Sequence, residues 1–306
     1  MSKINVNYIN SLKTENIVTN SEKYFKEQIE ALVSEFLKKP KLPKFILVAG
    51  PSSSGKTTSS YIIKKNLKEN GIDATVISID DFFLDRKNTP LLPNGDKDYD
   101  STRAIDWDLF SKVAKSIIKN EKCLIPKYDF KTGVKKFPNK EYTPSKDKIY
   151  IVEGLHALNP IMDEYIKRDL SKKIFVSPIS EFYYDEKKHL DIYNLRLIRR
   201  LVRDVEARNI SPEKTLKNWK NVREAEEKYI YPFKDLADFK IDSTHHYEPM
   251  IYKNIMEKIS KEFNSITKDL IKFLEPFNAV ETSKVPNSSL LKEFINNHWF
   301  FIFLQH

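Results

Sequence analysis

The segment GPSSSGKTT carries residue types that can hold a phosphate group. It runs from Gly50 to Thr58 and fits the pattern G-x-x-x-x-G-K-[ST]. Glycines let the backbone turn tightly and expose N–H groups to phosphate oxygens, and a following helix adds the positive end of its dipole. Lys56 would reach the β and γ phosphates, and the Thr57 hydroxyl would lie beside Mg²⁺. The predicted ATP-binding residues of this loop are Gly50, Ser52, Ser53, Ser54, Gly55, Lys56, Thr57 and Thr58.

Two acidic residues end other apolar segments, Asp80 in DATVISID and Glu153 in KIYIVEG. Ligands of parallel sheets bind at the carboxyl ends of the strands, so both residues should face the loop. Asp80 would accept the proton of an acceptor hydroxyl and help to hold Mg²⁺. The alternative is capping of the next turn, which is the role that we expect for Asp81.

Two classes of nucleotide-binding protein do not fit this pattern. A GTPase should carry an N-K-x-D segment, and the sequence has none at a suitable strand. Motor and AAA-type ATPases usually end the third strand with Asp-Glu, whereas this chain has the single residue Glu153. A small-molecule kinase needs a base and a group of arginines around the phosphates, and candidates for both are present.

Arginines gather in the segment NLRLIRRLVRDVEARN, which predicts a helix. Three of them, Arg196, Arg200 and Arg203, are four and three residues apart and share one face. Arginines that converge on a transferring phosphoryl group stabilise its charge, and we assign Arg200 to catalysis. The alternative is a solvated basic stripe paired with Asp204 and Glu206.

Alternating strands and helices must position these residues. Apolar runs predict strands at residues 45–49, 73–80, 148–154, 172–177 and 237–242. Helices are expected at residues 21–38, 57–69, 106–120, 189–208 and 212–229, and most of the chain beyond residue 247 should be helical. This order predicts the α/β class, namely a P-loop three-layer fold with a mainly parallel, doubly wound sheet and a helical arginine-rich lid. We divide it into an N-terminal helical segment (1–43, one packing helix), a kinase domain (44–250) and a helical C-terminal extension (251–306).

Composition limits the partners and the compartment. The formal net charge is +9, but the lysines are spread along the chain among many acidic residues, so we expect no nucleic-acid partner. The single cysteine, Cys123, cannot form an internal disulfide and favours a reducing, cytoplasmic location. No apolar stretch approaches the roughly 20 residues of a membrane span, and no signal peptide is apparent. The apolar stretch NNHWFFIFLQH receives no function.

Seven segments together resemble the uridine kinase/phosphoribulokinase family of P-loop kinases, and the bacterial nucleoside kinase branch in particular. They occur in the family's order over residues 44–250: GPSSSGKTT, ISIDDFF, DYDSTRAIDWDLF, PKYDF, IVEGLHAL, LRLIRRLVRD and ADF. Weaker similarity extends to about residue 295 through VPNSSLLKEFI. The resemblance implies ATP and Mg²⁺ as cofactors and transfer of a phosphoryl group to a sugar hydroxyl, the 5′-hydroxyl when the substrate is a nucleoside. It also favours a homo-oligomer.

The resemblance implies a role for each matching residue. Asp80 corresponds to the base and Glu153 to the acidic residue near Mg²⁺. The substrate would be held by Asp100 at the ribose hydroxyls, Tyr128 beside the base, and Arg196. Core packing against Phe130 is the alternative for Tyr128. Arg199, Arg200 and Arg203 correspond to a mobile arginine cap over ATP, and Asp238 to a position by the ATP base.

The chain departs from the family where a pyrimidine would be read. Uridine–cytidine kinases follow the YDF segment with a histidine and an arginine, whereas this chain has KTGVKK. Lys135 or Lys136 could replace the arginine, but lysine does not offer the same planar fork. His156 has two interpretations, a substrate contact or a structural role. Uridine or cytidine is the expected substrate, and another sugar-like alcohol or a nucleotide-sensing, RNA-associated role remain alternatives.

Overall fold

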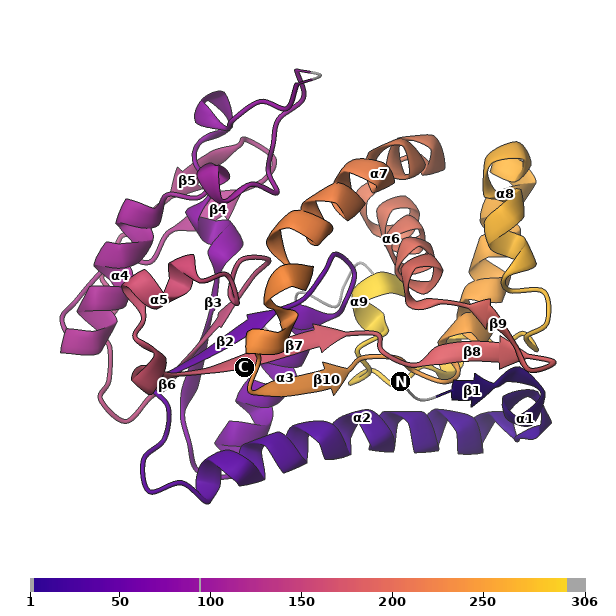
Figure 1. Ribbon diagram of the computed structural model, residues 1–306, viewed down its shortest axis with the longest axis horizontal. Coiled ribbons are helices and arrows are strands. Elements are labelled where there is room, and N and C mark those ends of the chain that lie inside the picture. The colour runs from indigo at the N-terminus through magenta and orange to yellow at the C-terminus, as the bar shows by residue number, and fades with distance from the viewer. Residues whose placement is uncertain (1–2, 94, 296–306) are drawn as a thin grey trace.

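The computed structural model describes residues 3–93 and 95–295, and it confirms the predicted α/β class. Five parallel strands form the central sheet in the order β10-β7-β2-β6-β3 (Figure 1). Their bounds are β2 Phe45–Ala49, β3 Ala74–Ser78, β6 Ile149–Glu153, β7 Ser171–Ser177 and β10 Phe239–Asp242. The five expected strands are therefore present, and the carboxyl end of β2 leads into the phosphate loop.

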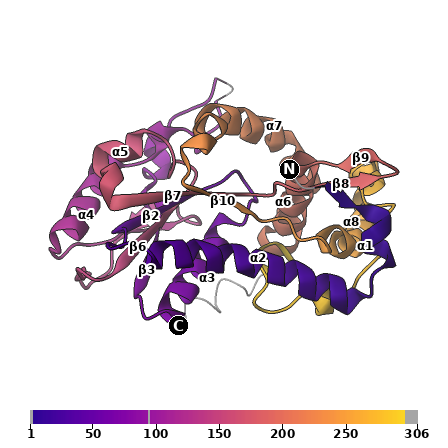
Figure 2. The same ribbon diagram turned by 60° about the horizontal axis from the view of Figure 1, so that its bottom comes forward.

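Alternation along β2 explains why helices cover both faces of the sheet. Ile46 and Val48 belong to one apolar core, and Phe45, Leu47 and Ala49 belong to another. A strand sends successive side chains to opposite faces, so each core needs its own helices. The first core is covered by α2 (Thr14–Leu37), α3 (Lys56–Glu69), α6 (Ile192–Arg208) and α8 (Glu248–Lys272), and the second by α4 (Trp107–Lys119) and α5 (Ile161–Tyr165). Figure 2 shows α2 and α3 side by side, on the side of the sheet away from α4 and α5.

The N-terminal segment is more than the single helix that we predicted. It contains β1 (Lys3–Asn5), α1 (Val6–Ser11) and α2. Strand β1 pairs in parallel with β8 (Glu181–Tyr184), which forms a hairpin with β9 (Lys187–Leu190). The local pattern of a three-residue strand does not reveal a partner almost 180 positions away, so this second sheet escaped prediction.

The remaining elements surround the carboxyl edge of the main sheet. A short hairpin joins β4 (Lys127–Asp129) to β5 (Val134–Lys136), and α7 (Pro212–Tyr229) follows α6. Helix α8 bends at Phe263, and α9 (Lys292–Ile295) lies against α6 (Figure 1). The apolar stretch at residues 296–306 lies outside the described residues. Within the described ranges, none of the helices combines the length and the apolar character that crossing a membrane requires.

Candidate active site

The loop between β2 and α3 requires both of its glycines. A Cβ at Gly50 would lie 2.1 Å from the carbonyl oxygen of Val176, and one at Gly55 would lie 2.6 Å from a methyl carbon of Leu290. Gly55 also has φ +84°, and Ser53 has φ 57°, so the loop passes twice through the left-handed region. Such a path turns successive N–H groups toward one side, which suits an anion.

Helix α3 begins at Lys56, directly after the loop, and points its amino end at the same place. The Thr57 hydroxyl donates to Glu153 Oε2 at 3.2 Å. The pKa of Glu153 is raised to about 7, chiefly by burial. The Lys56 charge lowers it and the Asp80 charge raises it, and the value of about 7 includes both effects. A cation beside this carboxylate would stabilise its charged form.

These oxygen donors fit Mg²⁺. Thr57, Glu153 and Asp80 offer a hydroxyl and two carboxylates, the ligand types that Mg²⁺ accepts alongside substrate phosphates. No group of three or more His, Cys, Asp and Glu side chains among the described residues could hold a metal without such help. These side chains could therefore supply part of a magnesium site, in which substrate phosphates would complete the coordination.

Asp80 lies in a 3₁₀ turn, Ile79–Phe82, at the end of β3. The Ser78 hydroxyl caps the turn by accepting the Asp80 N–H. The Asp80 carboxylate is therefore not needed as the cap of this turn. Burial raises the pKa of Asp80; the Lys56 charge acts in the other direction, and the neighbouring Asp81 raises it again. A buried carboxylate of raised pKa beside the phosphate loop has the properties of a general base.

Asp81 does not cap the next turn as we predicted. Its carboxylate accepts the side-chain ammonium of Lys127 at 2.6 Å and the backbone N–H of Tyr128 at 3.2 Å. Asp81 therefore attaches β4 to the turn that carries Asp80.

Asp100 lies within electrostatic reach of the loop. Burial raises its pKa to about 6; Arg200 lowers it, whereas Asp98, Glu226 and Asp80 raise it. Asp100, Asp80 and Arg200 therefore lie close enough to influence one another electrostatically.

Tyr128 lies in an aromatic cluster next to this group. Its ring packs edge-on against Phe83 and Phe130, with centroids 5.6 and 5.1 Å away, and only 6% of the residue is exposed. The buried Tyr128 hydroxyl has no hydrogen-bond partner among the described residues. These contacts favour the alternative in which Tyr128 packs in the core against Phe130, rather than beside the base of a substrate.

His156 is buried near the backbone of Asp100 and Ser101. Burial lowers its pKa to about 4, so the ring is neutral at pH 7. The ring packs edge-on against Trp107 and Tyr229, and its Nδ1 is without a hydrogen-bond partner in the described part of the chain. A neutral histidine in aromatic surroundings corresponds to the structural interpretation.

Four of the five arginines of α6 contact the loop, and they do so at the same two residues. Arg196 and Arg199 donate to the carbonyl oxygens of Ser52 and Ser53, at 3.0 and 3.2 Å. The hydroxyls of Ser52 and Ser53 accept from Arg200 at 2.8 Å and from Arg203 at 3.2 Å. The solvated basic stripe is therefore excluded, because the four guanidinium groups face the loop.

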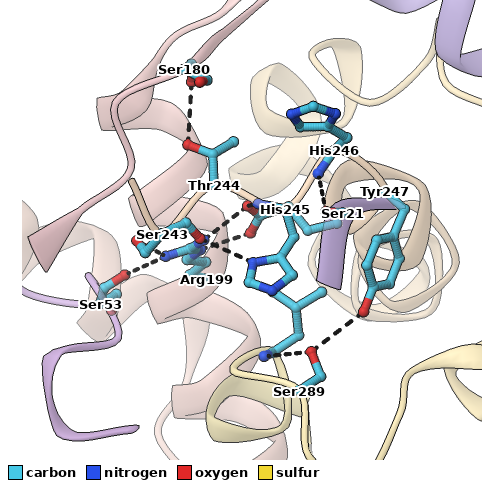
Figure 3. Close-up of polar contacts among 12 residues, drawn as sticks. Ser21, Ser53, Ser180, Arg199, Ser243, Thr244, His245, His246, Tyr247 and Ser289 are labelled. Atoms are coloured by element: carbon cyan, nitrogen blue, oxygen red, sulfur yellow. Dashed lines mark hydrogen bonds and ion pairs between the residues drawn. The ribbon is translucent and has the colours of Figure 1, made fainter. Parts of the chain in front are cut away.

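Arg196 and Arg199 are held too firmly for a mobile cap. Both are completely buried. Arg196 forms a two-bond ion pair with Glu226 of α7, at 2.6 and 2.8 Å. Arg199 forms one with Glu248, at 2.7 and 2.8 Å, and also reaches Ser243 (Figure 3). Their charges are thus neutralised inside the protein, which corrects our prediction that Arg196 faces the substrate and that Arg199 covers ATP.

Arg200 and Arg203 have looser surroundings. Arg200 keeps 20% of its side chain exposed and lies 3.5 Å from Asp204. Arg203 pairs with Glu293 at 3.2 Å, and burial lowers its pKa to about 10. These two, rather than all four, remain candidates for contact with a transferred phosphoryl group.

Asp238 does not join the site. Its carboxylate accepts from Arg168 at 2.6 Å and from the backbone N–H of Lys173 at 2.7 Å. It lines a cavity of about 340 Å³ together with Lys41 and Pro43, which precede β2 at the amino edge of the sheet. The predicted ATP contact is wrong here, because the loop lies at the opposite, carboxyl edge.

Two of the three lysines of KTGVKK, Lys135 and Lys136, are engaged in ion pairs. Lys135 pairs with Asp106 at 2.7 Å, and Lys136 pairs with Asp129 at 2.6 Å. Asp106 also caps α4 through the backbone N–H of Leu109. Neither ammonium therefore replaces the missing arginine that would read a pyrimidine.

Sequence reasoning missed three acidic residues that shape the loop, Glu226, Glu248 and Glu293. Glu226 also accepts the backbone N–H of Ser52 at 2.9 Å. Glu226 and Glu248 lie in none of the segments that carry the family resemblance, whereas Glu293 lies in VPNSSLLKEFI, where the resemblance is weaker. The available signal was indirect: four arginines near a phosphate loop require countercharges, and helices that follow them along the chain can supply these.

Several known proteins are similar to this chain. A model of the phosphoribulokinase/uridine kinase family matches residues 45–248. A uridine kinase of Ureaplasma urealyticum is 29% identical over 204 residues, which cover 66% of this chain and 88% of the relative. A uridine kinase of Deinococcus deserti is 27% identical over 210 residues, covering 68% and 92%. A solved structure of a possible uridine kinase from Bacillus stearothermophilus is 16% identical, covers 71% of this chain and 98% of its own, and has a TM-score of 0.49.

Proposed function

The chain belongs to the phosphoribulokinase/uridine kinase family, and from this premise we propose that it is an ATP-dependent nucleoside kinase. It would transfer the γ-phosphoryl group of ATP to the 5′-hydroxyl of uridine or cytidine, in pyrimidine salvage. The observation that carries this proposal is the electrostatic group of Asp80, Asp100 and Arg200 at the mouth of the phosphate loop.

The residues divide the reaction between them. Asp80 would take the proton of the acceptor hydroxyl while the oxygen attacks the γ-phosphorus and the bond to the β-phosphate oxygen breaks, so that ADP leaves. The raised pKa of Asp80 favours this transfer, because a more basic carboxylate accepts the proton more readily. Asp100 would accept hydrogen bonds from the ribose hydroxyls, which fixes the acceptor oxygen in line.

Lys56 and the loop N–H groups would hold the phosphates from one side. Arg200 would hold them from the other, since its guanidinium already reaches Ser52 of the loop. Mg²⁺, held by Thr57 and Glu153 together with the phosphates, would neutralise negative charge on the transferred group. Preorganised positive charge of this kind is the main means by which phosphoryl transfer is accelerated.

A second candidate acceptor is another small sugar-like alcohol, as in phosphoribulokinase or pantothenate kinase relatives. One observation favours it: Lys135 and Lys136 are both paired with aspartates, so neither presents a free ammonium to a pyrimidine. Steady-state assays with ATP and Mg²⁺ across nucleosides and sugar alcohols separate the two acceptors. RNA binding that falls with salt, without turnover of any acceptor, would support the nucleotide-sensing or RNA-associated alternative instead.

We further propose a cytoplasmic homo-oligomer without a nucleic-acid partner. Light scattering coupled to size-exclusion chromatography measures the mass in solution, and a mass near 36.0 kDa would contradict the oligomer.

Substitution of the base gives the sharpest test of the mechanism. We expect Asp80→Asn to lower kcat by at least about 100-fold, because the amide cannot accept the proton, while ATP still binds. Asp108→Asn, an exposed aspartate on α4, serves as the matched control and should leave kcat unchanged. Turnover of Asp80→Asn at the wild-type rate for every acceptor would refute the assignment of the base.

A further inference from the structure

The C-terminal segment beyond the family match lies directly on the phosphate loop. The match ends at residue 248, yet Leu290 is in contact with Gly55, so closely that a Cβ at Gly55 would clash with it. Phe294 lies under the guanidinium groups of Arg199 and Arg203, 5.0 and 5.6 Å from its ring centre. Leu290 and Phe294 are completely buried. Part of the surroundings of the loop is therefore built by residues that lie beyond the matched range 45–248.

One charged residue of this segment reaches both sides of the loop. Glu293 Oε2 accepts the hydroxyl of Thr58, in the first turn of α3. Its other oxygen, Oε1, pairs with Nη1 of Arg203 at 3.2 Å. Arg203 in turn donates through Nη2 to the hydroxyl of Ser53 at 3.2 Å. The four side chains thus form a continuous connection from Ser53 to Thr58.

We propose that Glu293 is a positioning residue of the phosphate site, which fixes Arg203 and the first turn of α3 around the loop. The proposal rests on the proposed ATP-dependent function. Glu293 does not itself contact the substrate; it acts through Arg203 and Thr58.

Electrostatics explains why a carboxylate is needed at this position. Glu293 and Arg203 each expose only 14% of their side chains, so water screens neither charge well. A guanidinium left without its countercharge in such surroundings would turn toward solvent and lose its bond to Ser53. Because Ser53 holds a left-handed φ of 57°, the loop at this residue depends on support from its neighbours.

The test compares two carboxylates of the C-terminal extension. Glu293→Gln keeps an acceptor for Thr58 but removes the charge that holds Arg203. We expect the Kd for Mg·ATP, measured by titration calorimetry, to rise about tenfold, with KM for the acceptor unchanged. Glu281→Gln is the matched control: its exposed carboxylate accepts from Asn254 at 3.4 Å, and the variant should bind ATP like the wild type. An equal Kd for the two variants would overturn the proposal.

A double-mutant cycle separates positioning from general stability. If Glu293 acts through Arg203, Arg203→Met should weaken ATP binding, and adding Glu293→Gln to it should change the Kd by less than about twofold. Effects that add fully would show two independent roles and reject the proposal. Thermal unfolding of each variant identifies any that has simply lost its fold.

Hydrogen exchange of the ATP-free protein distinguishes failure of this inference from failure of the proposed function. Exchange at residues 53–58 should be faster in Glu293→Gln than in Glu281→Gln. If the wild type binds no ATP, the proposed function is wrong. The role of Glu293 is then tested only by comparing the exchange rates of the two variants at residues 53–58. Equal exchange in both variants would then reject it.

Discussion

Single residues in this site owe their properties to burial next to like charges. Glu153, Asp80 and Asp100 all have raised pKa values, and burial is the largest cause for each. Lys56 lies near Asp80 and Glu153, but its one charge does not compensate for two buried carboxylates. Two buried carboxylates beside a single ammonium are electrostatically unfavourable, and a bound cation would relieve this.

This imbalance predicts that Glu153 lowers the stability of the folded protein by an amount that depends on pH. Its pKa rises from 4.5 to about 7 on folding, so the folded state favours the protonated form. Below pH 4.5 the carboxyl is protonated in both states and does not change the free energy of unfolding. As the pH rises from 4.5 through 7, burial of the carboxylate increasingly lowers the stability of the folded state. We expect Glu153→Gln to unfold like the wild type at pH 4.5 and to be more stable by up to about 3 kcal/mol at pH 7.5 without Mg²⁺.

Chemical denaturation of both proteins at several pH values measures this difference. Added Mg²⁺ with a nucleotide should shrink it, because the wild-type carboxylate then gains a cation. A stability difference that stays constant from pH 4.5 to 7.5 would contradict the raised pKa.

At the scale of elements, α6 and α7 form a support for the loop. Arg196 and Glu226 connect the two helices, and both residues bond to Ser52, Arg196 at its carbonyl oxygen and Glu226 at its N–H group. The ion pair is completely buried. Its main consequence is geometric, because the pair fixes the orientation of both the N–H and the carbonyl group of Ser52.

We expect Glu226→Gln to destabilise the protein by about 3 to 5 kcal/mol, because Arg196 would remain buried with less countercharge. Glu227→Gln is the matched control: this neighbour has 58% of its side chain exposed and pairs only with Arg223, so its loss should cost under about 1 kcal/mol. The double variant Arg196→Met/Glu226→Met should recover much of the stability but not the affinity for ATP. Denaturant unfolding and calorimetry measure the two quantities, and recovery of both would refute a role of the pair in shaping the loop.

The sequence allowed the prediction of elements whose signal is local. The run Phe45–Ala49 is apolar throughout and became β2 with the expected bounds, and residues 212–229 became α7. The glycines and Lys56 of the loop were predictable because their spacing is fixed by phosphate geometry. What could not be predicted depends on pairing between distant segments, such as β1 with β8. The partners of the arginines belong to this second kind, since a spacing of three or four residues shows a shared face but not what that face meets.

For the molecule as a whole, segments outside the family region hold the site together. Glu22 of α2 lies 3.6 Å from Nε2 of His245, which follows β10. The His245 backbone N–H donates to Glu248, the partner of Arg199, and Arg199 reaches Ser53 of the loop (Figure 3). A polar connection thus extends from the N-terminal helix to the phosphate loop.

This connection predicts how stability depends on pH. Burial lowers the pKa of His245, but the hydrogen bond and charge of Glu22 and the charge of Glu248 raise it to a net value above 6.5, while Arg199 opposes them. A raised histidine pKa stabilises the folded state fully below pH 6.5, and this contribution is lost as the pH rises through the folded value. Glu22→Gln should therefore cost about 1 to 2 kcal/mol at pH 5.5 and less at pH 9.

Tyr247→Phe is the matched control, since the Tyr247 hydroxyl donates to the same Glu22 carboxylate at 2.5 Å. It removes one hydrogen bond to Glu22 but leaves the charge of Glu22 beside His245, so its cost should stay nearly constant from pH 5.5 to 9. Denaturant unfolding of the three proteins across this range gives both differences. A cost of Glu22→Gln that does not decline with pH would mean that His245 is not charged in the folded protein. The N-terminal helix would then be held to the site by packing and neutral hydrogen bonds, and loss of Glu22 would affect the loop equally at every pH.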